Sequence, residues 1–152
     1  TTELRELMEI RGGLFELVVR KLADQPHPEL LPLLRAGTER LQALATEPDA
    51  GGEYAETTYR LIILCARLAG NQKLHRLLTG LSLQTLRYSK LGLATVERRK
   101  RSASLWRKAL DAQINGDVES LVSLARTRIY ESSQESTRQM KALLTINAGN
   151  LK

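Results

Sequence analysis

The sequence is poor in cysteine, proline and aromatic side chains. Cys65 is the only cysteine among 152 residues, which excludes an internal disulfide framework and indicates a reducing compartment. Four prolines and ten glycines are too few for the many turns of a β-rich fold. The longest uninterrupted apolar run, residues 61–66, is far shorter than the ~20 residues of a membrane helix. We therefore expect a cytoplasmic protein without a membrane partner.

The sequence also lacks the motifs of common enzymes. It contains no nucleophile elbow, no phosphate-binding lysine loop, no dinucleotide glycine motif and no His-Glu-x-x-His. His27 lies between two prolines and His75 between basic neighbours, settings typical of solvated side chains. Cys65 lies in the most apolar run, where a thiol is usually a small core residue. We expect a protein that is not an enzyme and binds no cofactor.

Apolar residues recur with the 3.6-residue period of amphipathic helices. This pattern predicts six helices, at residues 2–23, 29–46, 53–69, 72–89, 96–115 and from 117 onward. Gly70 and Gly116 are expected to end two of them. Residues 61–66 are apolar on all sides, which predicts a buried third helix. Residues 131–141 are polar on nearly every side, so we expect the last helix to fray or project into solvent there. The sequence thus predicts an all-α antiparallel bundle around a buried central helix.

The charge of the chain is positive and unevenly placed. Lys and Arg number 23 against 17 Asp and Glu, a formal net charge of +6. Residues 87–108 include the consecutive basic side chains Arg98, Arg99, Lys100 and Arg101. Such a run is typical of an anion or nucleic-acid patch, and equally of a solvated helix start. The sequence alone leaves both interpretations open.

Two polar side chains on apolar helix faces are candidates for a binding site. Thr58 precedes Ile62 by one turn on the buried helix, and Arg128 shares a stripe with residues 121, 122 and 125. A guanidinium on an inward face must be paired, must reach solvent, or must await an anionic ligand.

Three segments of the chain follow one another in a familiar order. They are Glu3-Leu4-Arg5-Glu6-Leu7-Met8-Glu9-Ile10-Arg11, residues 59–71 ending in Ala69-Gly70-Asn71, and residues 105–117, from which the similarity continues to Tyr130. This order resembles the FCD domain, the C-terminal effector-binding domain of FadR-type transcription regulators in the GntR family. The resemblance implies a bundle of six to seven helices that forms a homodimer. It also implies a preceding winged helix-turn-helix domain, absent here, that reads operator DNA.

The resemblance covers almost the whole chain. On this basis residues 1–147 are the FCD-like domain and residues 148–152 a C-terminal tail. Many FCD domains hold a divalent metal through one Asp and three His. Aligned through Gly70-Asn71 and Gly116-Asp117, these positions fall on Thr58, Ile62, Trp106 and Arg128. Because none of the four is a usual metal ligand, the resemblance implies a lost metal site, as in the fatty-acid-responsive FadR branch.

The resemblance therefore implies the effector-binding and dimerisation domain of a bacterial regulator. We expect it to sense a small organic anion, a carboxylate or an acyl-CoA-like molecule, without a metal. The expected effector-binding residues are Thr58, Tyr59, Ile62, Trp106 and Arg128. In this hypothesis Arg128 anchors the anion, Thr58 forms a hydrogen bond to it and Trp106 narrows the cavity.

Two other functions remain open at this point. One is a helical protein-interaction module with a filled core. The other is a basic helix bundle that binds nucleic acid through residues 98–101 without sequence preference. A cavity of roughly 300 Å³ or more would favour the sensor over the filled module.

Overall fold

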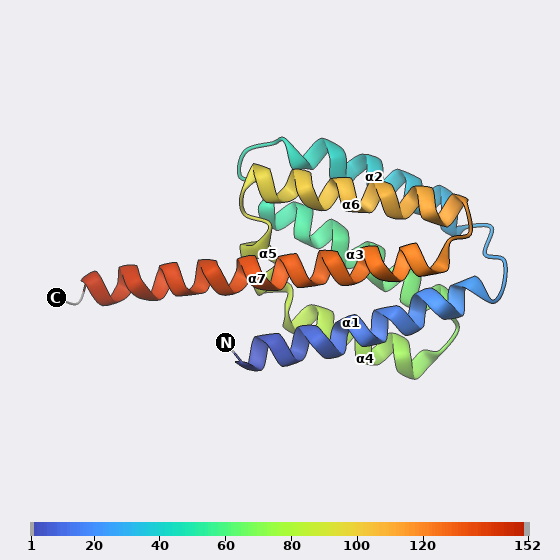
Figure 1. The fold of residues 1–152 in the computed structure, drawn as a ribbon, viewed down its shortest axis with the longest axis horizontal. Helices are drawn as coiled ribbons and strands as arrows, with labels where there is room; N and C mark the ends of the chain where they lie inside the picture. The colour runs from blue at the N-terminus through green and yellow to red at the C-terminus, as the bar shows by residue number, and fades with distance from the viewer. Residues whose placement is uncertain (1, 151–152) are drawn as a thin grey trace.

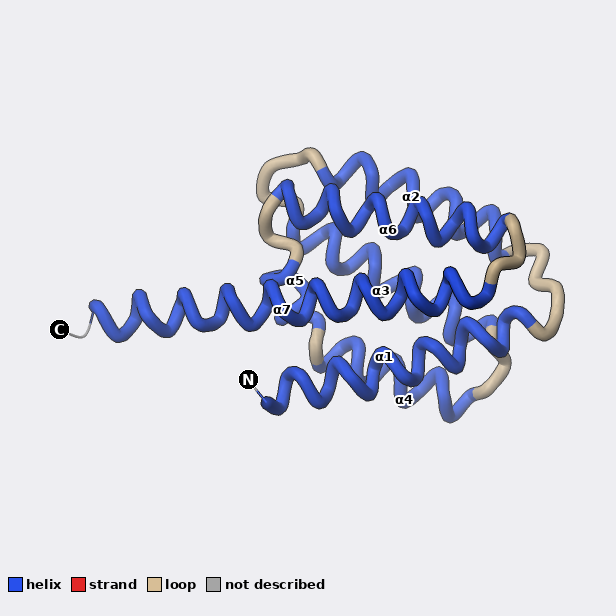
Figure 2. Tube along the Cα trace, viewed as in Figure 1, coloured by secondary structure: helices blue, strands red, loops and turns tan. Residues whose placement is uncertain are grey.

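The computed structural model describes residues 2–150, and this part of the chain is all α-helical, without a strand (Figure 1; Figure 2). Its helices are α1 (Thr2–Ala23), α2 (Leu30–Ala45), α3 (Gly51–Leu68), α4 (Gln72–Gln84), α5 (Leu86–Gly92), α6 (Val96–Ile114) and α7 (Val118–Asn150). The all-α bundle predicted from the sequence is confirmed. No helix of residues 2–150 is long and apolar enough to cross a membrane.

Helix α3 lies at the centre of the bundle, as its apolar sequence predicted. It contacts α1, α2, α4 and α5, and its side chains Tyr54, Ala55 and Ala66 are completely buried. Helices α2 and α6 lie together along one edge of the bundle, while α1 and α4 lie along the opposite edge (Figure 1). Helix α7 packs between these edges on α1, α5 and α6. Each large apolar side chain that is fully buried in this core contributes roughly 1.5–3 kcal/mol.

Two predicted helix ends are confirmed by the backbone. Gly70 and Gly116 have φ angles of +79° and +66°, values that glycine adopts without a steric penalty. After the first of them, Asn71 begins α4, because its side chain accepts a hydrogen bond from the backbone N–H of Leu74 at 3.0 Å. These turns reverse the chain between neighbouring antiparallel helices.

The predicted single helix over residues 72–89 is wrong, because the chain breaks at Thr85. The Thr85 hydroxyl donates to the backbone oxygen of Leu81 at 2.8 Å, a local bond that often accompanies a bend in a helix. Helix α5 then begins at Leu86 and ends at Gly92, three residues beyond the predicted end of the helix at residue 89. The break directs α5 towards α7 and places Ser89 on an inner face.

Gly92 allows α5 to pack directly against α7. A Cβ atom at this position would lie 2.7 Å from the backbone oxygen of Ser132 and 2.8 Å from Oγ of Ser136. Both distances are shorter than van der Waals contact, and one of the two atoms belongs to the backbone. The absence of a side chain at Gly92 therefore sets the distance between the two helices.

Helix α7 does not fray in its polar segment. Glu135 and Ser136 are buried against the body, and the helix continues to Asn150, projecting beyond the other helices (Figure 1). The projecting part is exposed, and it includes Leu143, Leu144 and Ile146. The predicted tail therefore begins inside α7, although residues 151 and 152 lie outside the described part of the chain.

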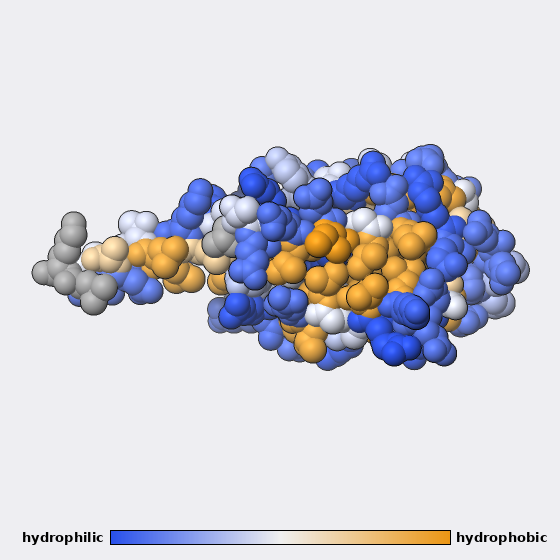
Figure 3. Space-filling model, turned by 90° about the horizontal axis from the view of Figure 1, so that it is seen from below, coloured by the Kyte–Doolittle hydropathy of each residue, from blue (hydrophilic) through white to orange (hydrophobic). Residues whose placement is uncertain are grey.

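The side of the molecule formed by α1 and α4 carries a broad apolar area (Figure 3). Ile10 and Leu17 of α1 are 54% and 45% exposed, and Leu77 of α4 is 60% exposed. Leu14 and Leu81 are partly buried on the same helix faces. This area, called the α1–α4 face below, is defined by these five side chains.

Candidate functional site

A small cavity lies inside the bundle and is lined by residues of α1, α3, α5, α6 and α7. Its volume is about 40 Å³, which is room for roughly three water molecules. Thr58, Ile62, Trp106 and Arg128 all line it. The four positions that the resemblance aligned with metal ligands therefore meet around one cavity, although they lie on three helices far apart in the sequence.

Arg128 lies against aromatic rings and not against an acid. Its Cζ is 3.8 Å from the centroid of the Trp106 ring and 5.8 Å from that of Phe15. Part of the side chain stays accessible, but Nε is buried and has no hydrogen-bond partner among residues 2–150. Burial, and then the charge of Arg11, lower the pKa of Arg128 to about 10. Aromatic faces stabilise this cation only partly, because they carry no net charge.

Arg11 of α1 is a second cation of the cavity, and the sequence interpretation missed it. The side chain is 8% exposed. Its Nη1 donates long hydrogen bonds of 3.4 Å to Oγ1 of Thr85 and to Oγ of Ser89, both of them neutral acceptors. Burial lowers the pKa of Arg11 to about 10. A signal existed in the sequence, since Arg11 follows Met8 by three residues and precedes Phe15 by four, on the buried stripe of α1.

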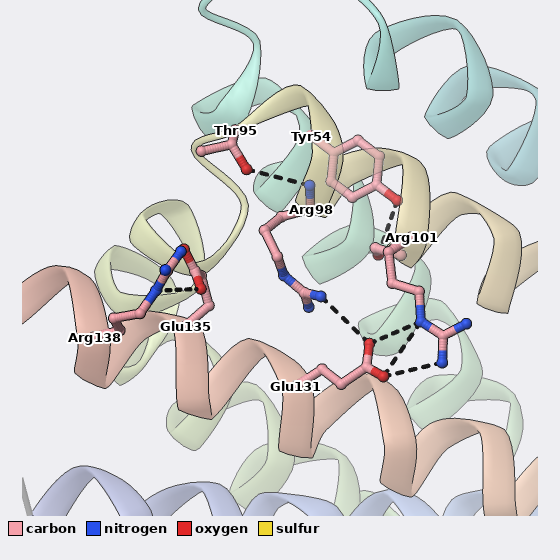
Figure 4. A network of polar contacts seen from close by, with 8 residues as sticks. Tyr54, Thr95, Arg98, Arg101, Glu131, Glu135 and Arg138 are labelled. Atoms are coloured by element: carbon pink, nitrogen blue, oxygen red, sulfur yellow. Dashed lines mark hydrogen bonds and ion pairs between the residues drawn. The ribbon is translucent and has the colours of Figure 1, made fainter.

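Arg98 is the third arginine at the cavity, but it has an acidic partner. Its Nη1 lies 3.4 Å from Oε2 of Glu131, and Nη2 of Arg101 lies 3.0 Å from Oε1 of the same carboxylate (Figure 4). The hydrogen bonds and the charge of Arg101 hold the pKa of Glu131 below its usual value. Glu131 thus offsets charge on α6, whereas no acid among residues 2–150 lines the cavity beside Arg11 and Arg128.

The basic run of residues 98–101 does not form one exposed patch. Arg99 is only 1% exposed, and its guanidinium donates to the backbone oxygens of Leu93 at 3.0 Å, Ala94 at 2.8 Å and Glu47. It joins two loops of the fold. Lys100 is exposed on the surface, while Arg98 and Arg101 face Glu131. The four side chains therefore lie in different environments.

The hydroxyl groups near the cavity differ in whether their protons are available for a further hydrogen bond. The Thr58 hydroxyl donates to the backbone oxygen of Ala55 at 2.8 Å, so its proton is engaged within α3. Ser102 accepts a hydrogen bond of 2.9 Å from Tyr54 (Figure 4), which leaves its own proton for another acceptor. Burial raises the pKa of Tyr54 to about 12, so the phenol stays neutral. Tyr59 is partly exposed and does not line the cavity.

Comparison with known families identifies the domain. Residues 6–131, most of the chain, match the FCD domain. The chain belongs to the FCD domain family. FCD domains are the effector-binding domains of GntR-family transcription regulators, which are not enzymes. No curated protein and no solved structure matches the chain significantly.

The residues of this FCD domain do not fit the divalent metal that many relatives hold. Ile62 has no donor atom, the Trp106 indole does not bind metals, and Arg128 is itself a cation. Thr58 could offer only a hydroxyl. In the part of the chain that the structure describes, no group of three or more His, Cys, Asp or Glu could hold an ion. The cavity carries positive charge from its own side chains.

Cys65 lines a second, mainly apolar space of about 40 Å³ that Arg128 and Trp106 also line. The thiol is buried, and burial raises its pKa to about 12. A thiol with such a pKa is almost never ionised at neutral pH. Cys65 is therefore a small core side chain, as its apolar surroundings in the sequence predicted.

Proposed function

We propose that this FCD domain binds a small organic anion at Arg128 and thereby senses the effector of a GntR/FadR-type regulator. The observation that carries the proposal is a guanidinium held inside the bundle against Trp106 without an acidic partner. A charge in such a place is costly unless a counterion joins it. A planar guanidinium suits a carboxylate, which can accept two parallel hydrogen bonds.

The volume of the cavity limits what the anion can be. About 40 Å³ accommodates a group of a few heavy atoms but no acyl chain, so we favour a compact anion over an acyl-CoA-like molecule. The same volume is well below the roughly 300 Å³ of an ordinary ligand pocket. It therefore favours one second candidate, a helical interaction module with a filled core. Anion binding separates the two candidates.

Arg128→Met tests the proposed anion site. Methionine keeps much of the bulk and removes the charge, so binding of a compact carboxylate should weaken by about 2 kcal/mol or more, roughly thirtyfold. Isothermal titration calorimetry with short mono- and dicarboxylates measures this change. Arg107→Met is the matched control, because Arg107 follows Trp106 in sequence but is exposed. Equal binding by both variants would remove Arg128 from the site.

Binding of the anion would act on DNA through the first helix. Arg11 lies on α1 and Arg128 on α7, and an anion between them draws these helices together. A ligand shifts a conformational equilibrium only through different affinities for the two states. In the proposed regulator, the DNA-binding domain joins the chain before α1, so a movement of α1 would reach it directly.

We also propose that a second copy of the chain covers the α1–α4 face. Exposed leucine and isoleucine side chains gathered on one face are typical of homodimer interfaces. Leu77→Lys should convert a dimer at tens of micromolar into a monomer, as measured by light scattering. Leu33→Lys is the control, because Leu33 is similarly exposed on α2, at the opposite edge of the bundle. A wild-type monomer at that concentration would contradict the proposal.

The proposed site works without a metal. The four side chains that the resemblance aligns with the family's metal ligands line the cavity and offer no more than the Thr58 hydroxyl as a donor atom. Elemental analysis of the purified, dialysed protein should therefore find far less than one atom of zinc, nickel or manganese per chain. A content near one atom would overturn this part of the proposal.

A further inference from the structure

Two cations at the cavity have no counterion within the described chain. Among residues 2–150, Arg11 donates only to neutral acceptors, and Arg128 lies against the Trp106 and Phe15 rings without a hydrogen bond or an ion pair. The Nε atoms of both side chains are buried without a hydrogen-bond partner among residues 2–150, and so is Nε of Arg98. Arg98 at the same cavity is already matched by Glu131. The lining therefore carries two uncompensated positive charges.

We infer that the ligand of this cavity is a compact dianion that bridges Arg11 of α1 and Arg128 of α7. This inference rests on the proposed function and specifies the class of its ligand. A monoanion would neutralise one of the two uncompensated charges and leave the other without a partner. A dianion matches both, and charge-assisted hydrogen bonds to two guanidinium groups are among the strongest available.

The two arginines are held in place by different neighbours. Thr85 and Ser89 accept from Nη1 of Arg11, which leaves the rest of that guanidinium for another acceptor. Trp106 stacks on Arg128 at 3.8 Å, and stacking leaves the N–H groups in the guanidinium plane free to donate. Both side chains line the same cavity. They are thus oriented before a ligand arrives, and orientation in advance lowers the entropic cost of binding.

The cavity also limits the ligand to a small size and supplies one neutral donor. A volume of about 40 Å³ matches a tetrahedral oxyanion or the shortest dicarboxylates, and excludes long-chain diacids. Ser102 lines the same space and retains its hydroxyl proton while it accepts from Tyr54. The shared chemistry of the possible ligands is two negative charges on a few heavy atoms.

The test compares anions of different charge on the same protein. Melting temperatures are measured at about pH 8, where inorganic phosphate carries close to two charges, with phosphate, oxalate, malonate or acetate added at equal ionic strength. We expect a saturable rise in melting temperature with at least one dianion and none with acetate. Oxalate and malonate against phosphate distinguish a dicarboxylate site from a tetrahedral oxyanion site.

Variants distinguish binding from general salt effects, since phosphate stabilises many proteins nonspecifically. Arg11→Met and Arg128→Met should each weaken dianion binding about tenfold or more, while Arg107→Met should respond like the wild type. Without added anion, both cavity variants should melt at or above the wild-type temperature, because each removes an uncompensated buried charge. This second readout does not depend on the choice of anion.

Two results would overturn the inference in different ways. If acetate stabilises as strongly as the dianions, through Arg128 and not through Arg11, the dianion is excluded while the proposed anion site remains. If every anion shifts the melting temperatures of Arg11→Met and Arg128→Met by as much as that of Arg107→Met, both the dianion and the proposed anion site are excluded. Melting of Arg11→Met well below the wild type would show that Arg11 is a structural residue.

Discussion

Arg99 and Arg128 are both arginines inside the bundle, yet their surroundings are opposite. Arg99 donates to three backbone oxygens that belong to two different loops. Arg128 stacks on Trp106 and forms no hydrogen bond within the described chain, whereas Arg99 leaves only its Nε without a partner and donates from both Nη atoms. Arg11 resembles Arg128, because within residues 2–150 it forms only long hydrogen bonds to neutral atoms. The protein thus uses the same side chain for two different tasks.

The difference shows how a structural arginine can be told from a ligand-binding one. A buried guanidinium whose Nη groups donate to the fold, as those of Arg99 do, holds the fold together. A buried guanidinium whose donors are left over lowers stability until an anion satisfies them. Hydropathy and burial alone do not make this distinction, because Arg99, which the fold holds by hydrogen bonds, is more buried than Arg128. The distinction requires knowing which atoms each guanidinium contacts.

The largest effect on stability is expected from removing Arg99, which donates hydrogen bonds to the fold. Arg99→Met should lower the free energy of unfolding by about 3 kcal/mol, because three carbonyl oxygens lose a charged donor. Chemical denaturation measures the loss. Lys100→Met is the control, since Lys100 is exposed next to it in the sequence and should change stability by less than about 0.5 kcal/mol. Similar stabilities for both variants would show that the contacts of Arg99 contribute little.

A smaller effect on stability is expected from giving Arg11 an acidic partner inside the chain. Ser89 lies 3.4 Å from Nη1 of Arg11, so Ser89→Asp would place a carboxylate beside that guanidinium. We expect it to be about 1.5 kcal/mol more stable than Ser89→Asn, which has the same shape without the charge. Denaturation of the two variants in parallel measures the difference, and calorimetry should show weaker anion binding by the Asp variant. Equal stabilities would mean that the charge of Arg11 is already compensated.

The smallest effect on stability is expected from removing the charge of Glu131, the partly exposed carboxylate that lies beside Arg98 and Arg101. Arg101 and Arg98 hold the pKa of Glu131 below its usual value, so this carboxylate stabilises the fold above its unfolded pKa of about 4.3. The contribution is lost as the pH falls through the lower folded pKa. Glu131→Gln should therefore cost about 1 kcal/mol or less at neutral pH.

The pH dependence separates this charge effect from other consequences of the substitution. The difference in stability between the wild type and Glu131→Gln should shrink as the pH falls from neutral to about 3. Denaturant melts along that pH series measure it. A difference that stays constant with pH would show that the charge of Glu131 is not responsible.

Much of the site could be foreseen, and what was missed has a clear physical reason. Arg128 was recognisable because it interrupts an apolar stripe, and the FCD resemblance aligned it with Thr58, Ile62 and Trp106. Arg11 was missed, although Met8 and Phe15 lie on the same stripe of α1, because arginine side chains on amphipathic helices are mostly exposed. The break at Thr85 was also missed, because Leu86 continues the apolar period of α4.

The sequence by itself determined all of the helices except the division between α4 and α5, the buried position of α3 and the family to which the domain belongs. Helical period and burial follow from the order of apolar residues along one segment, so they can be read locally. Only the tertiary structure decided which arginines have partners. The consecutive residues Arg98 and Arg99 point to a carboxylate on α7 and to backbone oxygens of two loops, whereas Arg11 and Arg128, more than a hundred positions apart, line one cavity. Hydrogen bonds and charge interactions act over a few ångströms in space, and the packing of helices distant in sequence determines which groups come within that range.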